Sequence, residues 1–367
     1  MLLNVFPAKR NVTDNFKLMY RRILLGILPA LICIMFDIQL VKSQENIQKK
    51  FRFMFYNVEN LFDTEDDPAT EDDEFLPGGE RRWNINRYRL KLQSIYKVIT
   101  AAGEWDPPAI VGICEAENKK AIDDLLLLTP LGKSGDYDIV HEDSDDPRGI
   151  DVCLIYRKDY VKLLYYKYIY PFSFYSRNIR TRKVLYSKFL VENDTLHLFL
   201  NHWPSRRGGV LAGEESRIAL ANLLIQQADS VRKSSGECSK IIFAGDFNSL
   251  PSSDEIKVLT DSGEKGSFLN LGMSHFLRGT GTYKYEGIWE MPDQIIVSKT
   301  MLPDFQRCRG IYTSEDFFEI FSPDFLLLRD RKFSGQKPFS TYSGYSYQGG
   351  FSDHLPVILD LVVQPGR

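Results

Sequence analysis

Short apolar runs rich in β-branched and aromatic residues recur along this chain, and polar or turn-forming residues bound most of them. Runs of this kind are typical of β-strands that are buried on at least one face. The predicted strands are residues 51–56, 110–114, 152–156, 196–201, 241–244, 294–297 and 356–361.

Two longer segments space their apolar residues with the helical period. Residues 88–102 place Leu92, Ile95 and Ile99 on one face, and residues 214–231 show the same spacing. Because the predicted strands alternate with such helices, the expected fold class is α/β with a layered arrangement.

The first 43 residues have the layout of a targeting segment. Lys17, Arg21 and Arg22 precede an apolar run at residues 23–36, and Ser43 supplies a small residue before a cleavage point. This order predicts a secretory signal peptide. The run is shorter than the ~20 residues of a bilayer-spanning helix, and an uncleaved membrane anchor is the alternative. In either case we expect an exported protein whose membrane contact, where it has any, uses this segment.

No Pro-, Gly- or Ser-rich linker, repeat or low-complexity tract divides residues 44–367. We therefore expect one domain, acting as a monomer. This part contains 40 Lys and Arg against 47 Asp and Glu, a net charge of about −7. No global positive field exists, so a polyanionic substrate would have to meet a local basic patch or a metal ion.

Four cysteines follow residue 43. Cys114 and Cys153 lie inside predicted strands and are expected to be small buried hydrophobic residues. The even number permits disulfides in an oxidising compartment, but no dense disulfide framework is indicated.

Several predicted strands run directly into polar side chains that can do chemistry. The strand ends are followed or closed by Asn57, Glu115, His202, Asp246 and Asn248. Residues at the carboxyl ends of strands in layered α/β folds commonly converge on one crevice. We therefore expect one site at these strand ends.

The residue types at that site suit metal-assisted hydrolysis of a phosphoester. A phosphodiester is anionic, so catalysis needs a cation, a base that activates water, and donors for the phosphoryl oxygens. Mg²⁺ takes carboxylate and amide oxygens and keeps several waters; Mn²⁺ or Ca²⁺ are the alternatives. Asp246 and Asn248 also have the spacing of an Asx turn that closes a strand, which is compatible with a catalytic role.

The ordered series of short motifs resembles the endonuclease/exonuclease/phosphatase superfamily, in an exported bacterial-type form. Each motif alone is weak, but six in this order across residues 51–362 are specific. They are Asn57-Val58-Glu59-Asn60, Cys114-Glu115-Ala116-Glu117-Asn118, Asn201-His202-Trp203-Pro204-Ser205, Gly245-Asp246-Phe247-Asn248, Asp293-Gln294-Ile295-Ile296 and Ser352-Asp353-His354-Leu355-Pro356. The resemblance implies a four-layer α/β sandwich, in which two mixed β-sheets pack face to face with helices outside, and a divalent metal site between the sheet edges.

The resemblance also implies roles for individual residues. The expected metal ligands are Glu115, Asn57 and Asp353. The expected catalytic residues are Asp246 as base, Asn248 and His202 on the phosphate, and His354 held by Asp293 or Asp353.

Further positions concern the phosphate and the substrate. Arg182 resembles a phosphate-side Arg, and Glu142 resembles the Glu that supports the first His; ordinary exposed charges are the alternative for both. Ser205 and Arg206 open a basic loop that we expect at the substrate. Many relatives carry Arg after the late-strand Asp, whereas this chain has Gln294, which puts any substrate contact of that Arg in doubt.

The substrate is less well determined than the chemistry. Basic loops around Arg182 and Arg206 could grip a nucleic-acid backbone, so a nuclease is the first expectation. A phosphomonoesterase, or a sphingomyelinase-like or inositol-phosphate hydrolase, is the enzymatic alternative. An inactive family member that binds a surface partner is the non-enzymatic one, and the presence of every expected site residue argues against it.

Overall fold

The computed structural model describes residues 49–171, 182–205, 210–261, 267–305 and 307–364. The expected signal peptide or anchor and Arg206 lie outside these ranges. Within them, no helix is both long enough and apolar enough to span a lipid bilayer.

The first large sheet has the strand order β13-β19-β1-β2-β4-β3, and β14 also pairs with β19. Only the β1–β2 pair is parallel; the other pairs are antiparallel. Its strands are β1 (Lys49–Leu61), β2 (Ile110–Ala116), β3 (Tyr137–Val140), β4 (Asp151–Arg157), β13 (Ile311–Tyr312), β14 (Phe318–Ile320) and β19 (Val357–Val363).

The second large sheet has the order β5-β6-β7-β8-β12-β9, and only β7 and β8 run parallel. Its strands are β5 (Lys162–Ile169), β6 (Val184–Val191), β7 (Asp194–His202), β8 (Lys240–Asp246), β9 (Phe268–Asn270) and β12 (Asp293–Ser298). Every predicted strand is present in one of the two sheets. The sheets also contain strands that were not predicted, namely β3, β5, β6, β9, β13 and β14.

Helices and small hairpins complete the described chain. The helices are α2 (Ile85–Gly103), α3 (Lys119–Leu127), α4 (Leu131–Ser134), α5 (Val210–Ser235), α6 (Asp254–Asp261) and α7 (Met273–Leu277), with short 3-10 turns η1 (Asp73–Phe75), η4 (Lys299–Met301), η5 (Glu315–Phe317) and η6 (Asp324–Leu326). The hairpins are β10 (Tyr283–Tyr285) with β11 (Ile288–Glu290), β15 (Leu327–Arg329) with β16 (Gln336–Pro338), and β17 (Tyr342–Ser343) with β18 (Ser346–Tyr347). Both predicted helices are confirmed, as α2 and α5.

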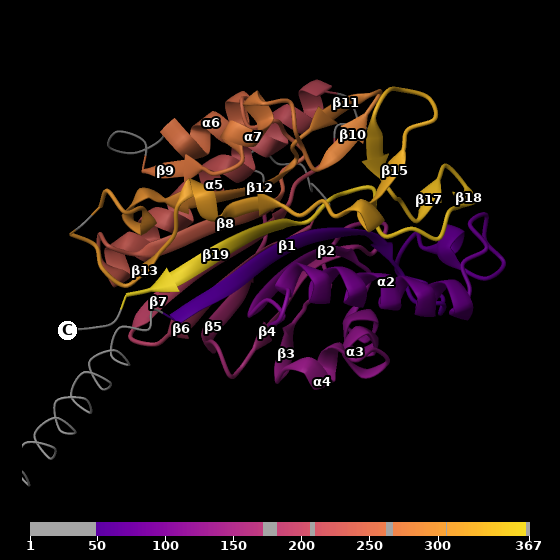
Figure 1. Ribbon diagram of the computed structural model, residues 1–367, viewed down its shortest axis with the longest axis horizontal. Helices are drawn as coiled ribbons and strands as arrows, with labels where there is room; N and C mark the ends of the chain where they lie inside the picture. The colour runs from indigo at the N-terminus through magenta and orange to yellow at the C-terminus, as the bar shows by residue number, and fades with distance from the viewer. Residues whose placement is uncertain (1–48, 172–181, 206–209, 262–266, 306, 365–367) are drawn as a thin grey trace, which may run out of the picture. The chain divides into compact units, whose positions relative to one another are not determined.

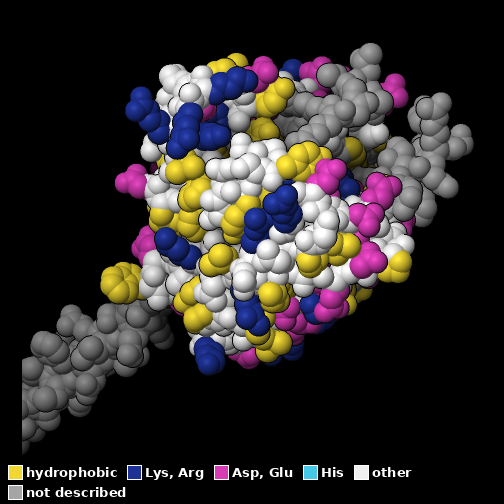
Figure 2. Space-filling model, turned by 90° about the vertical axis from the view of Figure 1, so that its right-hand side faces the viewer, with side chains coloured by type: hydrophobic (Ala, Val, Ile, Leu, Met, Phe, Trp, Pro, Cys, Tyr) yellow, Lys and Arg dark blue, Asp and Glu magenta, His cyan; other side chains and the backbone are white. Residues whose placement is uncertain are grey.

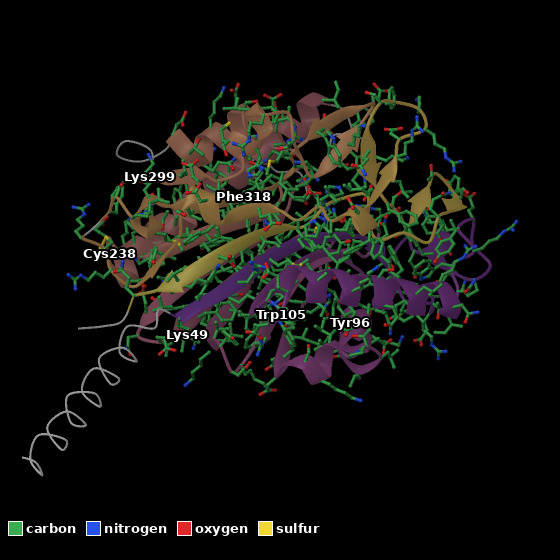
Figure 3. All side chains as sticks on the ribbon, in the orientation of Figure 1. Lys49, Tyr96, Trp105, Cys238, Lys299 and Phe318 are labelled. Atoms are coloured by element: carbon green, nitrogen blue, oxygen red, sulfur yellow. A yellow bond between two sulfur atoms is a disulfide. The ribbon has the colours of Figure 1, made fainter. Side chains whose placement is uncertain are left out.

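The two sheets pack face to face, with α2, α3 and α4 on one side and α5 and α6 on the other (Figure 1). Buried apolar side chains of both sheets form one core, which includes Phe318, and side chains fill the space between the ribbons (Figure 3). A second apolar cluster joins the outer face of the second sheet to α5 and α6. A Cβ on Gly112 of β2 would lie 2.8 Å from a terminal methyl group of Leu200 in β7, so the two sheets pack closely at this glycine. The predicted α/β sandwich is confirmed.

The strands that carry the predicted site are irregular at their ends. The β1–β2 register shifts between Asn57 and Leu61, and the β2–β4 register shifts between Cys114 and Ala116. Bulges of this kind bend a strand and re-aim its side chains, and they are frequent beside active sites.

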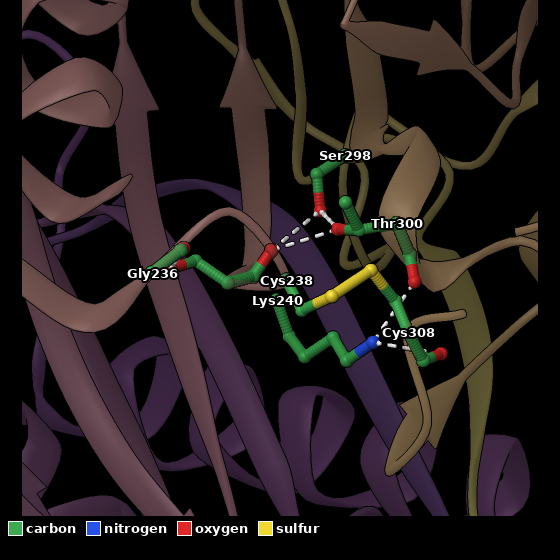
Figure 4. Close-up of a disulfide and its surroundings, with 7 residues drawn as sticks. Gly236, Cys238, Lys240, Ser298, Thr300 and Cys308 are labelled. Atoms are coloured by element: carbon green, nitrogen blue, oxygen red, sulfur yellow. Dashed lines mark hydrogen bonds between the residues drawn. A yellow bond between two sulfur atoms is a disulfide. The ribbon is translucent and has the colours of Figure 1, made fainter. Parts of the chain in front are cut away.

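One disulfide, Cys238–Cys308, ties the turn before β8 to the segment before β13 (Figure 4). The buried Lys240 ammonium donates to the carbonyl oxygens of Thr300 at 2.9 Å and Cys308 at 3.4 Å, so the cross-link holds an acceptor for a buried charge. Cys114 and Cys153 are free and buried, as predicted.

Replacing both bonded cysteines (Cys238→Ser with Cys308→Ser) should lower the free energy of unfolding by roughly 2–4 kcal/mol, because the cross-link restricts the unfolded chain. Urea denaturation measures the effect. A reducing agent should bring the wild-type protein close to the variant and leave the variant unchanged. Equal sensitivity of both proteins to the reductant would contradict the assignment.

Candidate active site

Neighbouring strand ends of the second sheet bring three ionisable side chains to one edge. His202 at the end of β7 pairs in register with Asp246 at the end of β8, and Asp246 pairs with Asp293 at the start of β12. All three are buried. Strand register alone therefore gathers residues that lie up to 91 positions apart in sequence.

Asn57 connects this edge to the first sheet. Its Nδ2 donates to Glu115 Oε1 at 3.2 Å and to Asp246 Oδ2 at 3.1 Å. Its Oδ1 accepts the backbone N–H of Glu59 at 3.0 Å, which fixes the amide orientation because the flipped amide would set two donors against each other. The amide oxygen expected at the metal therefore faces away from the carboxylates, and the structure places Asn57 as their shared hydrogen-bond donor.

Glu115 stands at the bulge that ends β2. Its φ of 65° is in the left-handed region, and its Oε2 accepts the N–H of Asn60 at 3.0 Å. Its Oε1 lies 3.8 Å from Nε2 of His202. The side chain is partly exposed, so its carboxylate has room for a cation beside these protein contacts.

Asp246 occupies the centre of the site. Besides Asn57, it accepts the backbone N–H of Asn248 at 2.8 Å, while Nε2 of His202 lies 3.7 Å away and Nε2 of His354 lies 4.0 Å away. Burial and the charge of Asp293 raise the pKa of Asp246 to about 6, although His354 opposes the shift. A carboxylate with this pKa suits proton transfer near neutral pH.

His354 forms an ion pair with Asp293. Its Nδ1 lies 2.7 Å from Asp293 Oδ2, so Asp293, and not Asp353, is the carboxylate that holds the ring. Burial lowers the pKa of His354, but the Asp293 charge and hydrogen bond outweigh it and hold that pKa well above its usual range. Thr282 donates to the same Asp293 oxygen, and the Tyr283 ring packs 4.8 Å from the imidazole. Neither contact was predicted, because no motif marks the hairpin that carries them.

His202 differs from His354 in that its imidazole is uncharged. Burial, followed by the charges of Arg182 and Arg148, holds its pKa well below the usual value, so the ring is neutral. Its Nδ1 is buried without a hydrogen-bond partner among the described atoms. The expectation that Glu142 supports this ring is wrong for this structure, because the exposed Glu142 pairs with Lys183 instead.

The Ser352-Asp353-His354 turn is fastened to β1. Ser352 Oγ donates to the carbonyl oxygen of Asn57 at 2.8 Å and accepts the N–H of His354 at 3.0 Å. Burial and the charges of Glu59 and then Glu115 raise the pKa of Asp353 to about 7. Asp353 thus lies in the electrostatic field of Glu59 and Glu115.

Asn248 and Arg182 meet at one carbonyl. Asn248, whose φ of 47° is left-handed, donates from Nδ2 to the carbonyl oxygen of Trp203 at 2.8 Å, and Arg182 donates to the same oxygen at 2.7 Å. Arg182 is buried and paired with Asp146 at 2.7 Å. The structure therefore makes Arg182 a support for the loop beside Asn248, not an open phosphate contact.

Two further predicted positions differ in accessibility. Ser205 is exposed at the entrance of the basic loop, whereas Arg206 falls outside the described residues. Gln294 is fully buried and donates to the carbonyl oxygens of Ser249 at 2.7 Å and Met291 at 2.9 Å, so it cannot touch a substrate.

The described residues could hold a divalent cation at this site. Asp246, Asp293 and His354 each offer a ligand atom, and these atoms lie within 4.8 Å of one another. Burial first, and then the charge of Asp293 on Asp246 and of Glu59 on Asp353, raises the pKa values of these two carboxyl groups. A hard cation prefers oxygen donors, so the carboxylates of the site fit such an ion, whereas the positively charged His354, paired with Asp293, offers it no lone pair.

A second group of possible ligands, His141, Asp143 and Asp151, does not fit a single ion as well. Asp143 approaches Nδ1 of the imidazole at 3.8 Å, and Asp151 approaches Nε2 at 3.2 Å. The two carboxylates thus lie on different nitrogens of one ring, which is the arrangement of a histidine held between two acids.

Comparison with known proteins gives a family. A family model described as "Endonuclease/Exonuclease/phosphatase family" matches residues 52–362, in agreement with the resemblance drawn from the motifs. A search of curated proteins finds no match.

Solved structures share the fold. An endonuclease/exonuclease/phosphatase from Bacteroides vulgatus is 17% identical over 86% of this chain and 100% of its own, with a TM-score of 0.53. A mannosyl-6-phosphatase from Bacteroides thetaiotaomicron is 15% identical over 85% and 99%, with a TM-score of 0.52. D. rerio TDP2 complexed with single-strand DNA product is 14% identical over 85% and 99%, with a TM-score of 0.50. At these identities the likeness shows the fold alone.

A divalent cation should raise the melting temperature, because it binds carboxylates that are crowded only in the folded state. At a free concentration one hundred times its Kd, the expected stabilisation is about 2.7 kcal/mol. Thermal melts in chelator and in titrated Mg²⁺, Mn²⁺ or Ca²⁺ measure it. Glu115→Gln should shift the titration to higher concentration, whereas the exposed Glu237→Gln should not; a wild-type titration in Glu115→Gln would remove Glu115 from the ion's surroundings.

Proposed function

Because the chain belongs to the endonuclease/exonuclease/phosphatase family, we propose that it is a Mg²⁺-dependent phosphodiesterase that cuts nucleic acid. The observation that carries the hydrolytic part is the buried Asp246 carboxylate, hydrogen-bonded to Asn57 and Asn248 and within 4.0 Å of a nitrogen of both histidines. A polar centre of this kind inside an apolar sandwich has no structural need, because apolar side chains would pack there at lower cost.

In the proposed reaction Asp246 accepts a proton from the attacking water as the water oxygen bonds to phosphorus. Its pKa of about 6 keeps it ionised at neutral pH yet basic enough to take that proton. The bond from phosphorus to the ester oxygen breaks, and the leaving oxygen takes up a proton from solvent. The positively charged His354, oriented by Asp293, donates from Nε2 toward a phosphoryl oxygen. The neutral His202 donates to another phosphoryl oxygen. In the strand order it lies on the other side of Asp246 from Asp293, which holds His354.

The cation would be held by Glu115 and Asp353, with Asp246 close by. Glu115 is partly exposed, and Asp353 lies in its field, whereas Asp293 is already committed to His354 and Thr282. When bound, the ion supplies the positive charge that offsets the charge developing on the phosphoryl group. Asn57 would orient Glu115 and Asp246 through hydrogen bonds instead of binding the ion.

A second candidate, hydrolysis of small phosphate esters, is favoured by the charge distribution. Arg182 and Lys183, two of the basic residues expected to grip a nucleic-acid backbone, are buried against Asp146 and Glu142. At the end of the sandwich that carries β17 and β18, Lys and Arg form separate groups with Asp and Glu between and around them, and no continuous basic surface is seen on this face (Figure 2). A mannosyl-6-phosphatase shares the fold, as does a protein solved with a DNA product, so the fold supports both candidates.

We also propose that the protein is exported. The disulfide Cys238–Cys308 supports this, because such bonds persist in oxidising compartments and are rare in reducing ones. The signal-like order of residues 1–43 is the independent sequence argument.

Asp246→Asn should lower turnover by roughly 10²–10⁴-fold with little change in melting temperature, because the side chain keeps its size but loses its basicity. The assay compares plasmid DNA, RNA, p-nitrophenyl phosphate, sugar phosphates, sphingomyelin and inositol phosphates, each with Mg²⁺ and with chelator. The exposed Asp261→Asn is the matched control and should retain full activity.

The substrate that is turned over decides between the candidates. Metal-dependent nicking of DNA or RNA that Asp246→Asn abolishes would support the nuclease. Release of inorganic phosphate without cleavage of DNA or RNA would indicate that phosphomonoesters are the substrates. Wild-type turnover in a folded Asp246→Asn protein would exclude Asp246 as the base, whatever the substrate.

A further inference from the structure

The segment that leads into the Ser352-Asp353-His354 turn makes a long excursion and returns to its starting point. It leaves at Thr341, forms the β17–β18 hairpin and comes back at Phe351, next to Ser352. The N–H of Phe351 donates to the carbonyl oxygen of Phe339 at 2.6 Å, so the two ends of the excursion lie side by side. Whatever fixes these ends also fixes the turn that follows.

Glu59 binds the beginning of this segment, at Thr341 and Tyr342. Its carboxylate accepts two consecutive backbone N–H groups, that of Thr341 at 2.6 Å and that of Tyr342 at 3.1 Å. Glu59 is buried and has a left-handed φ of 53°, and it belongs to the same bulge as Asn57. A single bulge thus aims Asn57 at the central carboxylates and Glu59 at the hairpin.

Lys91 holds both ends at once. From α2 its ammonium donates to Thr341 Oγ1 and to the carbonyl oxygen of Phe351, the latter at 2.7 Å. Its side chain is one of the largest fully buried in the described chain, with 2% exposed. The buried Lys91 ammonium therefore links the two ends of residues 341–351 to each other.

An ammonium in this position is expensive for stability alone. The neighbouring inward positions of α2, Leu92, Ile95 and Ile99, are apolar, and an apolar residue in place of a buried charge is often neutral or stabilising. Burial lowers the pKa of Lys91 to about 8, while the charges of Glu59, Asp353 and Glu115 oppose that shift. Lys91 therefore lies behind the acids of the site and balances part of their charge.

We propose that Lys91 and Glu59 are positioning residues of the active site, which clamp both ends of residues 341–351 and so fix Asp353 and His354 against Asn57 and Glu115. The inference rests on the proposed function, since it assigns Asp353 to the cation and His354 to the phosphate. The β17–β18 hairpin also packs on the sandwich at its base, where Tyr342 is buried against Phe75 and Trp83.

Three variants test the clamp in the full-length protein. Thr341→Val keeps the side-chain shape and removes one acceptor of Lys91. Lys91→Met keeps the side-chain length and removes the cation. The double variant Lys91→Met with Glu59→Gln removes both buried charges, and Arg89→Met, exposed on the same helix, is the control.

The readouts separate positioning from folding. They are kcat and KM on bis-p-nitrophenyl phosphate, Mn²⁺ affinity by calorimetry, hydrogen exchange of peptides spanning residues 339–355, and melting temperature. Lys91→Met should lower kcat and Mn²⁺ affinity by roughly 10–100-fold, the range for residues that orient a metal site, and Thr341→Val should do so more weakly. KM should change little, exchange should accelerate over residues 341–355, and Arg89→Met should match the wild type.

The double variant gives the sharpest distinction. A merely structural lysine predicts that removing both charges restores melting temperature and kcat together, whereas the clamp predicts recovery of melting temperature without kcat. If Lys91→Met does not fold, Thr341→Val and the double variant carry the test. Wild-type kcat, Mn²⁺ affinity and exchange in the folded variants would overturn the proposal. Absence of wild-type turnover would instead overturn the proposed function, and Mn²⁺ affinity and exchange would still decide on the clamp.

Discussion

The side chain of Asn57 is the contact on which the rest of the site depends. Two strand ends from different sheets present carboxylates to each other, and Asn57 donates one hydrogen bond to each of them. Buried acids that face one another repel unless a donor or a cation lies between them. The amide supplies such a donor in the protein itself, so Glu115 and Asp246 keep a defined separation before any ion binds.

The backbone around Asn57 shows how the sequence achieves this geometry. Glu59, Asn60, Glu115 and Asn248 all have φ between 47° and 65°, a region that costs free energy for residues other than glycine. Each of them lies beside a site residue or is one, and each has its strain compensated by a hydrogen bond from or to the site. Regular strand ends would turn these side chains to alternate faces, whereas the bulges aim them at one centre.

Much of this arrangement can be predicted from the sequence, and there are clear physical reasons why the remainder cannot. The apolar runs gave most strands of the two large sheets, and the polar residues after them gave Glu115, His202 and Asp246, because strand ends share an edge. Strand β5 carries exposed Leu164, Tyr165 and Tyr166 and does not alternate regularly between buried and exposed residues. Its pattern of apolar residues therefore did not predict a strand.

Side-chain partners were harder to predict than strand positions. The orientation of the Asn57 amide depends on a backbone N–H two residues later, and the burial of Arg182 depends on Asp146, 36 residues away. Lys91 looks in the sequence like any helical lysine, and only the fold shows what it touches. The structure therefore leaves fewer positive side chains at the site than the sequence led us to expect. Arg182 and Lys183 are neutralised by their own acids, and His202 is uncharged, so His354 is the positive side chain that remains beside Asp246. This imidazolium is already paired with Asp293, and the Lys91 ammonium balances only part of the charge of Glu59, Asp353 and Glu115, so little positive charge remains for an incoming phosphate. The charge balance of the site itself therefore calls for a bound cation, independently of the family to which the chain belongs.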